Sequence, residues 1–214
     1  MQTLPRRSAV PLRPRRSQTE RRAGTRALLL EATIGCLAER GYAHTTTTEV
    51  CRRAGVSQGA LFKHFATKTE LVSRAAEHLF AALVAEYRDA FAAAARDGDP
   101  IEAATRLLAE TFRQPHLQAA FELYLAARTD AALAVSLRPV VERHDANLRR
   151  QARELFPEAA AHSPDFEAVV DVVVSALQGS AMGGAAVRDE ARDARQLAYL
   201  TRLVRTSFAR PSQE

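Results

Sequence analysis

The stretch EVCRRAGVSQGALFKHF, residues 49–65, constrains the fold more than any other part of this 214-residue chain. It holds two short segments with apolar residues at helical spacing, separated by an Ala-Gly-Val-Ser turn. Gly55 allows the tight turn, and Ser57 is suited to cap the helix that follows. Leu61 and Phe65 stand one turn apart on the inner face of that helix. The pattern therefore predicts a helix-turn-helix.

Composition favours an all-α fold for the whole chain, because nine glycines and nine prolines are few beside the many alanines and leucines. Two cysteines, Cys36 and Cys51, are too few for a disulfide framework or a zinc site, so we expect a reducing, cytoplasmic location. The histidines lack the HxxxH or HExxH spacing of helical metal sites, and no phosphate loop or serine elbow occurs. We expect no metal, no cofactor and no enzymatic activity.

Basic charge is concentrated in the first third of the chain. Residues 1–75 carry 14 basic and 5 acidic residues, a net +9, whereas the remainder carries 16 basic and 20 acidic residues, a net −4. This asymmetry indicates an anionic partner for the first third only. Residues 1–20 are interpreted as a basic arm, which is either a disordered tail or an extra contact to nucleic acid; the two are compatible.

The periodicity predicts about nine helices, over residues 21–40, 47–54, 58–64, 68–96, 100–113, 115–128, 130–156, 164–187 and 189–208. Gly41 is expected to end the first, and Thr45 or Thr46 to cap the second, with Glu49 completing a capping box with Thr46. Pro139 either kinks or splits its helix, and the pattern leaves both open. We divide the chain into the arm, a DNA-binding domain over 21–75, with its motif at about 46–65, and a larger helical domain over 76–214.

Small and polar side chains occupy the outer face of the third predicted helix. Gln58, Gly59, Ala60, Lys63 and His64 point away from the apolar face. Small residues let a backbone approach base edges, Gln58 can offer an amide to adenine, and Lys63 and His64 can meet phosphates. Double-stranded DNA is therefore the expected partner of this face.

Residues Thr25–Leu71 resemble the DNA-binding region of TetR-type transcriptional regulators. The markers are Gly41-Tyr42, Thr45-Thr46, Ala54-Gly55-Val56-Ser57, Gly59, Leu61, Phe62, His64-Phe65, and Lys68 three before Leu71. The resemblance implies a DNA-binding set of Thr45, Thr46, Ser57, Gln58, Gly59, Ala60, Phe62, Lys63, His64 and Lys68. Phe62 departs from the family, where tyrosine is common, and its missing hydroxyl removes one phosphate hydrogen bond.

Aromatic side chains of the second half are candidates for a small-molecule pocket, with His144 as a polar group. The candidate effector-binding residues are Phe80, Val84, Tyr87, Phe112, Phe121, Tyr124 and His144. The alternative, that these side chains are simply core, is equally compatible with the pattern. The resemblance implies an effector cavity beneath the long fourth helix, and the effector itself cannot be read from the sequence.

The segment 164–187 has the length of a membrane span, but Asp171, Gln178 and many small residues make it a poor one, so we expect it between protein helices and no membrane partner. One of its sectors is aliphatic and the next consists mostly of small residues. The resemblance implies a homodimer through the last two helices, with Val172, Ala176, Gly179, Ser180, Gly183, Leu197, Leu200 and Val204 as candidate contacts. Packing within the subunit is the alternative.

Together these observations predict a dimeric, ligand-responsive, DNA-binding transcriptional regulator, with repression as the expected mode. The alternative function is a helical small-molecule-binding or scaffold protein whose helix-turn-helix is vestigial. The basic excess of the first 75 residues favours the regulator.

Overall fold

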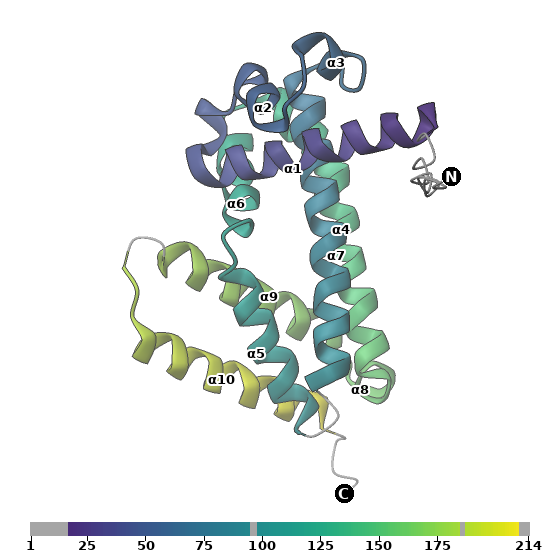
Figure 1. The fold of residues 1–214 in the computed structure, drawn as a ribbon. Coiled ribbons are helices and arrows are strands. Elements are labelled where there is room, and N and C mark those ends of the chain that lie inside the picture. Colours follow the sequence, from purple (N-terminus) through teal and green to yellow (C-terminus); the bar gives the residue numbers. More distant parts are fainter. Residues whose placement is uncertain (1–16, 95–97, 185–186, 210–214) are drawn as a thin grey trace, which may run out of the picture.

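The computed structural model describes residues 17–94, 98–184 and 187–209, and these residues form helices without strands (Figure 1). The helices are α1 (Gln18–His44), α2 (Thr47–Ala54), α3 (Gln58–Phe62), α4 (Lys68–Ala94), α5 (Pro100–Phe112), α6 (Leu117–Ala127), α7 (Ala131–Leu155), α8 (Pro157–His162), α9 (Phe166–Gly184) and α10 (Glu190–Phe208). The all-α prediction is confirmed. The six-residue α8 is the one helix in this set that the sequence pattern did not predict.

Two long helices, α4 and α7, run side by side through the molecule and connect its two ends (Figure 1). Helices α1, α2 and α3 gather at one end, while α5, α9 and α10 pack together at the other. Helix α6 packs against α1 and so joins the two groups. One apolar cluster extends from Leu29 in α1 to Val204 in α10, so both ends share a continuous core.

Short polar side chains start most of these helices. The N-cap side chain accepts a hydrogen bond from a first-turn N–H at Ser17, Thr46, Ser57, Asp99, Asp130 and Asp189. Ser17 and Glu20 form a full capping box, so α1 begins at Gln18 rather than at residue 21, and the predicted arm over 1–20 overlaps the helix. The rest of that arm, residues 1–16, lies outside the described residues.

The ends of three helices can be compared with the predicted ones. Gly41 adopts φ 72° and ψ 173°, which is not helical, so the regular first helix ends there as predicted, and a further short turn continues across the kink to His44. Helix α3 ends at Phe62 instead of residue 64. Helix α4 is described to Ala94, and its predicted end at residue 96 lies outside the described residues. Pro139 lies within the single helix α7, so it does not split that helix.

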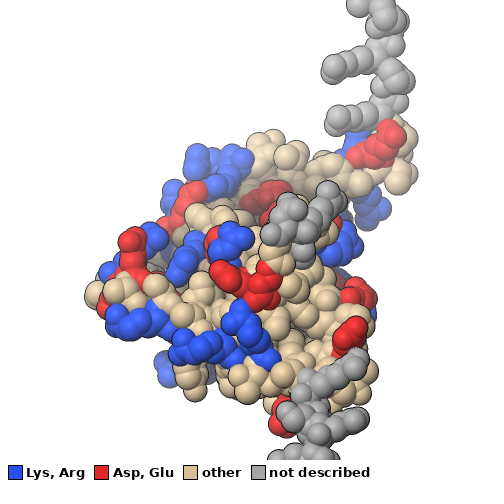
Figure 2. Space-filling view, turned by 90° about the horizontal axis from the view of Figure 1, so that it is seen from below, with Lys and Arg blue, Asp and Glu red and all other residues tan. Residues whose placement is uncertain are grey.

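By length and composition α9 is the one described helix that could cross a membrane. In the structure its face with Phe166, Val169, Val173 and Leu177 is buried in the core, and its outer Asp171 forms an ion pair with Arg149 of α7 at 2.8 Å. The prediction that α9 packs between protein helices is confirmed for this face. Seen from the end far from α3, the surface mixes basic and acidic side chains (Figure 2), as the slightly acidic balance of the second part predicts.

Candidate nucleic-acid interface

A closed turn at Gly55 joins α2 to α3. Gly55 lies in the left-handed region, with φ 69° and ψ 30°, where glycine carries no Cβ penalty. Its N–H and that of Val56 both bond to the carbonyl of Cys51. Ser57 Oγ then accepts a hydrogen bond from the N–H of Ala60 at 3.2 Å. These local bonds fix the direction of α3 against α2, so the predicted helix-turn-helix is present.

The start of α2 is capped from one side only. Thr46 Oγ1 accepts a hydrogen bond from the N–H of Glu49 at 3.2 Å. The Glu49 carboxylate instead accepts hydrogen bonds from Arg52 and pairs with Arg40 at 3.1 Å. The bond from Arg52 lowers the pKa of Glu49, so the carboxylate is held charged by its arginines. The expected capping box of Thr46 with Glu49 was therefore wrong for the glutamate, because two guanidinium groups compete for it.

The inner face of α3 is anchored in the core. Leu61 is fully buried and Phe65 is 1% exposed. The Arg26 guanidinium of α1 lies 5.2 Å from the Phe65 ring centroid, within cation–π range. The outer face of α3 is thus carried on a rigid support, as a helix that must enter a groove requires.

Most of the predicted contact set faces solvent. Exposed residues are Thr46, Ser57, Gln58, Gly59, Phe62 and Lys63, while Ala60, His64 and Lys68 are half-buried. Gln58 Nε2 donates to Thr48 Oγ1 at 2.6 Å, which holds the amide at the junction of α2 and α3. Phe62 is 50% exposed, an unusual position for a large apolar ring.

Gly59 is not required by the fold. A Cβ built on it meets nothing within 4 Å, and its backbone does not have the positive φ seen at Gly41 and Gly55. Glycine weakens a helix relative to alanine by roughly 0.5–1 kcal/mol. The packing of the subunit therefore gives no reason for glycine here, as it gives none at Gly24, Gly98, Gly179, Gly183 and Gly184; Gly59 differs from these in its place on the outer face of α3.

Two arginines of α1 lie near α3 and were missing from the predicted contact set. Burial lowers the pKa of His64, and the nearby positive charges of Arg22 and Arg26 lower it further. Arg22 and Arg26 stand four residues apart, so they share one face of α1. That spacing, together with the basic excess of the first third, was the signal that could have found them.

Thr45 does not belong to the exposed face. Its side chain is 2% exposed, and Oγ1 donates to the carbonyl of Gly41 at 2.8 Å. The prediction of Thr45 as a DNA contact was therefore wrong for this side chain. Its hydroxyl stabilises the kinked end of α1 instead.

Lys68 is committed to a junction that links the end of α1 and the start of α4 to α6 and the start of α7. Its Nζ donates to the carbonyl of Tyr42 at 3.0 Å and lies 4.2 Å from the Tyr42 ring centroid. Tyr42 in turn donates its hydroxyl to Asp130 at 2.8 Å and its N–H to Glu122 at 3.3 Å. Burial lowers the pKa of Lys68, and Asp130 opposes that shift. We call Tyr42, Lys68, Glu122 and Asp130 the Tyr42 junction.

The structure brings together some of the predicted effector residues. Phe80 stacks on His144 with centroids 4.0 Å apart and lies 6.4 Å from Tyr124. Burial lowers the pKa of His144 to about 4, so the ring is neutral at pH 7. Phe112 and Phe121 are buried in the core cluster, Val84 is half-buried, and the Tyr87 hydroxyl donates to the carbonyl of Ala104 at 3.0 Å. Phe112 and Phe121 border none of the three cavities described next.

Three cavities lie among the described residues of the half that contains α5, α9 and α10; the widest, of about 410 Å³, is lined by α5 and α10 side chains that include Glu102, Arg106 and Arg205. The other two are called the smaller and the larger cavity by their relative size. The smaller has a volume of about 80 Å³ and an almost wholly apolar lining, which includes Tyr87, Leu108, Ala152, Phe156, Val170 and Val174. The larger, of about 210 Å³, lies near the α9–α10 connection and is lined partly by Arg113, Gln118, Asp193 and Gln196. Of the predicted effector residues, only Tyr87 borders any of the three.

The predicted dimer contacts divide by exposure. Val172, Gly179 and Gly183 are exposed, while Ala176, Ser180 and Leu197 are half-buried. Leu200 and Val204 are 4% and 6% exposed, because they pack into the subunit's own core, so their assignment as partner contacts was wrong. Tyr199, 60% exposed on α10, was not predicted. The apolar periodicity of α10 follows the core-facing residues, which include Leu200. Tyr199 lies outside that face, so the periodicity did not indicate it.

Within the described residues no three His, Cys, Asp or Glu side chains gather closely enough to hold a metal ion. Cys36 and Cys51 are free and buried, and burial raises the pKa of both thiols.

The anchored α3, its polar outer face and the arginines beside it define a DNA-binding transcriptional regulator of the helix-turn-helix class. The profile described as "Bacterial regulatory proteins, tetR family" matches residues 29–81. An uncharacterized HTH-type transcriptional regulator of Mycobacterium tuberculosis is 30% identical over 167 residues, which cover 78% of this chain and 86% of that protein. The chain belongs to the TetR family of transcriptional regulators.

Other relatives match over nearly the whole length. The HTH-type transcriptional regulator CymR of Pseudomonas putida is 28% identical over 92% of this chain and 97% of its own. Among solved structures, the multidrug binding protein EbrR complexed with imidazole superposes with a TM-score of 0.65 at 24% identity, covering 94% of this chain and 100% of its own. A transcriptional regulator from Rhodococcus sp. superposes with a TM-score of 0.64 at 20% identity, over 87% and 99%. These two likenesses establish the shared fold.

Proposed function

We propose that this chain acts as a homodimeric, cytoplasmic repressor, which inserts α3 of each subunit into the major groove of a two-fold symmetric operator and leaves it when a small molecule binds. The observation that carries the proposal is Gly59, an exposed glycine on an anchored helix, for which the subunit's own packing gives no reason. A methyl group fits there in the free protein, so the empty space serves close approach of a partner.

The residues around Gly59 have separate roles in the proposal. Gln58 reads a base edge, because an amide can bond both N6 and N7 of adenine. Lys63, Arg22 and Arg26 meet phosphates, and Phe62 packs against the sugar–phosphate backbone. Phosphate contacts position the helix, whereas the base contact supplies sequence preference.

The helices outside the DNA-binding end are proposed to form the dimer and to transmit the effect of a bound ligand. The exposed Val172, Gly179 and Gly183 of α9 and Tyr199 of α10 are proposed to pair with the same residues of a second subunit. Helix α4 and the Tyr42 junction are the proposed route of coupling, since both connect the DNA-binding end to α6 and α7. A small shift of α4 would change the separation of the two α3 helices and so weaken operator binding.

Gel-shift titrations on DNA upstream of the protein's own gene test the proposal. Gly59→Ala is expected to stabilise the fold slightly, by roughly 0.5 kcal/mol, while lowering operator affinity about tenfold or more, because the added methyl meets DNA. Gln58→Ala should reduce the preference for operator over random DNA. Lys63→Ala should weaken both alike and lower the salt dependence by about one counterion.

The matched control is Arg150→Ala, which removes the same charge from an exposed position of α7 near the far end of the molecule. It should leave the gel shifts unchanged. Sedimentation of the bound particle should show two subunits per operator. The proposal fails if the wild type gives no specific shift, or if Gly59→Ala binds the operator as tightly as the wild type.

A further inference from the structure

Gln151 is an unusual residue for the middle of a buried helix face. It lies on α7 in line with Leu133, Leu137 and Val140, which all face the core, and it is 6% exposed. Neither its amide nitrogen nor its amide oxygen has a hydrogen-bond partner among the described residues. Since buried amides are nearly always paired, an amide with both atoms unpaired calls for a ligand-based explanation.

A second polar atom on the same face is in the same position. Nδ1 of His144 is buried and has no partner among the described residues. His144 precedes Gln151 by two helical turns, so the two side chains stand on one face about 10 Å apart along the axis. The buried face of α7, which is otherwise mostly apolar, thus contains two polar side chains with unpaired atoms.

Helix register places Gln151 at the level of the smaller cavity, next in the chain to a residue that lines it. Helices α4 and α7 run in the same direction, because Phe80 stacks on His144 and, further along both helices, Phe91 lies 5.9 Å from Phe156. Gln151 follows His144 by as many residues as Tyr87 follows Phe80, so Gln151 and Tyr87 stand at the same level. Tyr87 lines the apolar cavity of about 80 Å³, and so does Ala152, the neighbour of Gln151 in the chain.

Charged side chains of α7 lie outside the buried face of this region. Burial is the cause of the lowered pKa of His144 and of the raised pKa of Tyr87. Asp145 and Arg150 are exposed, although Asp145 contributes, after burial, to the raised pKa of Tyr124. Arg149 and Arg153 are paired outside the core with Asp171 and Glu167 of α9. A charged ligand would therefore be buried without a counter-charge, which is strongly unfavourable.

The larger cavity differs in this respect. Arg113 donates to Asp193 at 3.3 Å, Ser180 donates to the same carboxylate, and Gln196 donates to the carbonyl of Ala176. These three side chains are thus already paired within the subunit. Gln151, which has no partner among the described residues, instead stands next in the chain to Ala152, which lines the smaller cavity.

We propose that the effector is a small neutral amphiphile, whose apolar body, of at most one aromatic ring, fills the cavity beside Tyr87 and whose amide or hydroxyl head exchanges hydrogen bonds with Gln151. His144 Nδ1 offers a second polar contact to a longer member of that class. This inference rests on the proposed function, because it names the chemistry of the molecule that would release the operator.

Benzamide and benzoate form the test pair, since they have nearly the same shape and differ in charge. Calorimetric titration of the full-length wild type should show benzamide binding at millimolar concentration and no benzoate binding. Gln151→Met keeps the length and shape of the side chain, and it should weaken benzamide binding about tenfold by removing both hydrogen-bonding atoms. The unliganded variant should be no less stable than the wild type, because an unpaired buried amide is lost.

Gln118→Met is the matched control, because the same chemical change then falls on a residue lining the larger cavity. Its benzamide affinity should equal that of the wild type. Four results would each overturn the inference. In two of them the wild type binds benzoate as tightly as benzamide, or binds no benzamide at all. In the other two Gln151→Met binds benzamide as the wild type does, or the loss of binding is confined to Gln118→Met. Operator binding is measured separately without either probe, so failure of the proposed function would show there instead.

Discussion

The two ends of the molecule are specified in different ways. The α2–α3 region is short, and hydrogen bonds between close neighbours in the chain determine it, with caps at Thr46 and Ser57 and a left-handed Gly55. The half built from α5, α9 and α10 is held by contacts between distant segments, such as the bond between the buried hydroxyls of Thr105 and Thr201 at 2.9 Å. The comparison shows that neighbouring residues determine the shape of the α2–α3 surface, whereas the cavities of the other half depend on how distant segments pack.

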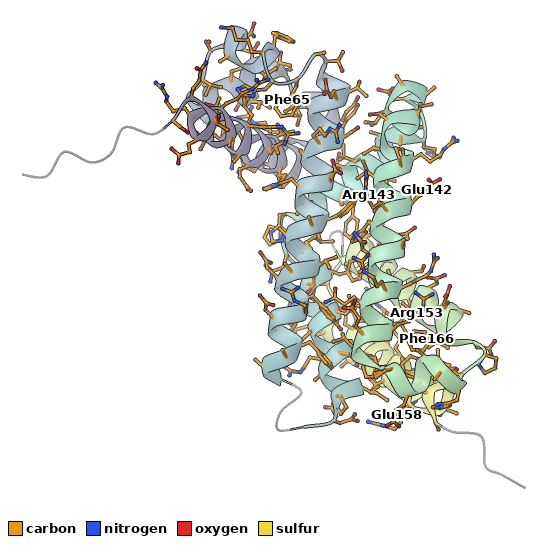
Figure 3. The ribbon with its side chains drawn as sticks, turned by 90° about the vertical axis from the view of Figure 1, so that its right-hand side faces the viewer. Phe65, Glu142, Arg143, Arg153, Glu158 and Phe166 are labelled. Atoms are coloured by element: carbon orange, nitrogen blue, oxygen red, sulfur yellow. The ribbon has the colours of Figure 1, made fainter. Side chains whose placement is uncertain are left out.

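The largest effect is expected from removing one buried ring at either end. Phe65 and Phe166 are 1% and 3% exposed and lie toward opposite ends (Figure 3). Each Phe→Ala variant should lower the free energy of unfolding by about 3–5 kcal/mol, as measured by urea titration. Phe65→Ala should also abolish the gel shift, because α3 loses its anchor.

Phe166→Ala serves as the paired variant for that experiment. It removes the ring that stacks on Phe208 at 4.8 Å, far from α3. In the cold, where the folded form still dominates, it should retain the gel shift. Equal loss of DNA binding in both variants would break the distinction between the two ends.

The next effect concerns acid. The pKa of His144 is lowered from 6.5 to about 4 in the folded protein, so the unfolded chain binds the extra proton as pH falls from about 6.5 toward 4. Stability should therefore decrease over that interval by roughly 3 kcal/mol and then level off. Urea midpoints between pH 7 and pH 4 measure it, and His144→Phe should flatten the curve.

The paired carboxylates of the DNA-binding end should respond at lower pH. Hydrogen bonds from Arg53 and Arg52 lower the pKa of Glu39 and Glu49 below the ordinary 4.5, so their contributions persist until pH falls below that value. The pKa of His64 is also lowered, so His64 can contribute to the loss of stability below pH 6.5. The comparison with His144→Phe separates the contribution of His144 from that of His64. If the curve of His144→Phe matched the wild type between pH 6.5 and 4.5, His144 would not be the group responsible.

The smallest effect is expected at the Tyr42 junction. Tyr42→Phe removes the hydroxyl that donates to Asp130, one of the causes of that carboxylate's lowered pKa, after the bond from the Leu133 N–H. The pKa of Asp130, followed by carboxyl NMR titration, should rise toward its ordinary value. Amide exchange in α2 and α3 should quicken a few-fold, while that of α9 stays unchanged.

Tyr199→Phe controls for the loss of a tyrosine hydroxyl, because it keeps the ring that is proposed to contact a second subunit, and the one described contact of Tyr199, with the Arg202 guanidinium, is made by that ring. It should leave both measurements as they are in the wild type. Unchanged exchange in Tyr42→Phe would mean that the junction does not hold the DNA-binding end to α6 and α7.

This contrast also explains what the sequence could predict. The extent of α2, the Gly55 turn and the caps at Thr46 and Ser57 depend on residues within a few positions, so their signals are local. Which of the four consecutive threonines are exposed cannot be read from their near neighbours in the chain. Thr45 is buried and Thr46 is exposed because of the way the kinked end of α1 packs.

Long-range partners escaped prediction for the same reason. Nothing near Lys68 in the chain indicates that its ammonium bonds to the Tyr42 carbonyl, 26 residues earlier. Leu200 and Val204 read as an apolar stripe, which is equally suited to a partner subunit or to the subunit's own core, and the fold of α10 against α5 and α9 selects the core. Gln151 was overlooked because a lone glutamine among charged residues is usually solvated.

Gly41 has a consequence for how the protein can change over time. Its backbone, with φ 72° and ψ 173°, is nearly restricted to glycine, and a Cβ there would also lie 2.7 Å from Oε2 of Glu122. A shorter side chain at position 122 would relieve the crowding but leave the torsional penalty. A substitution at position 122 alone therefore cannot restore a variant at position 41. Replacement of Gly41 is expected to remain destabilising whichever residue occupies position 122.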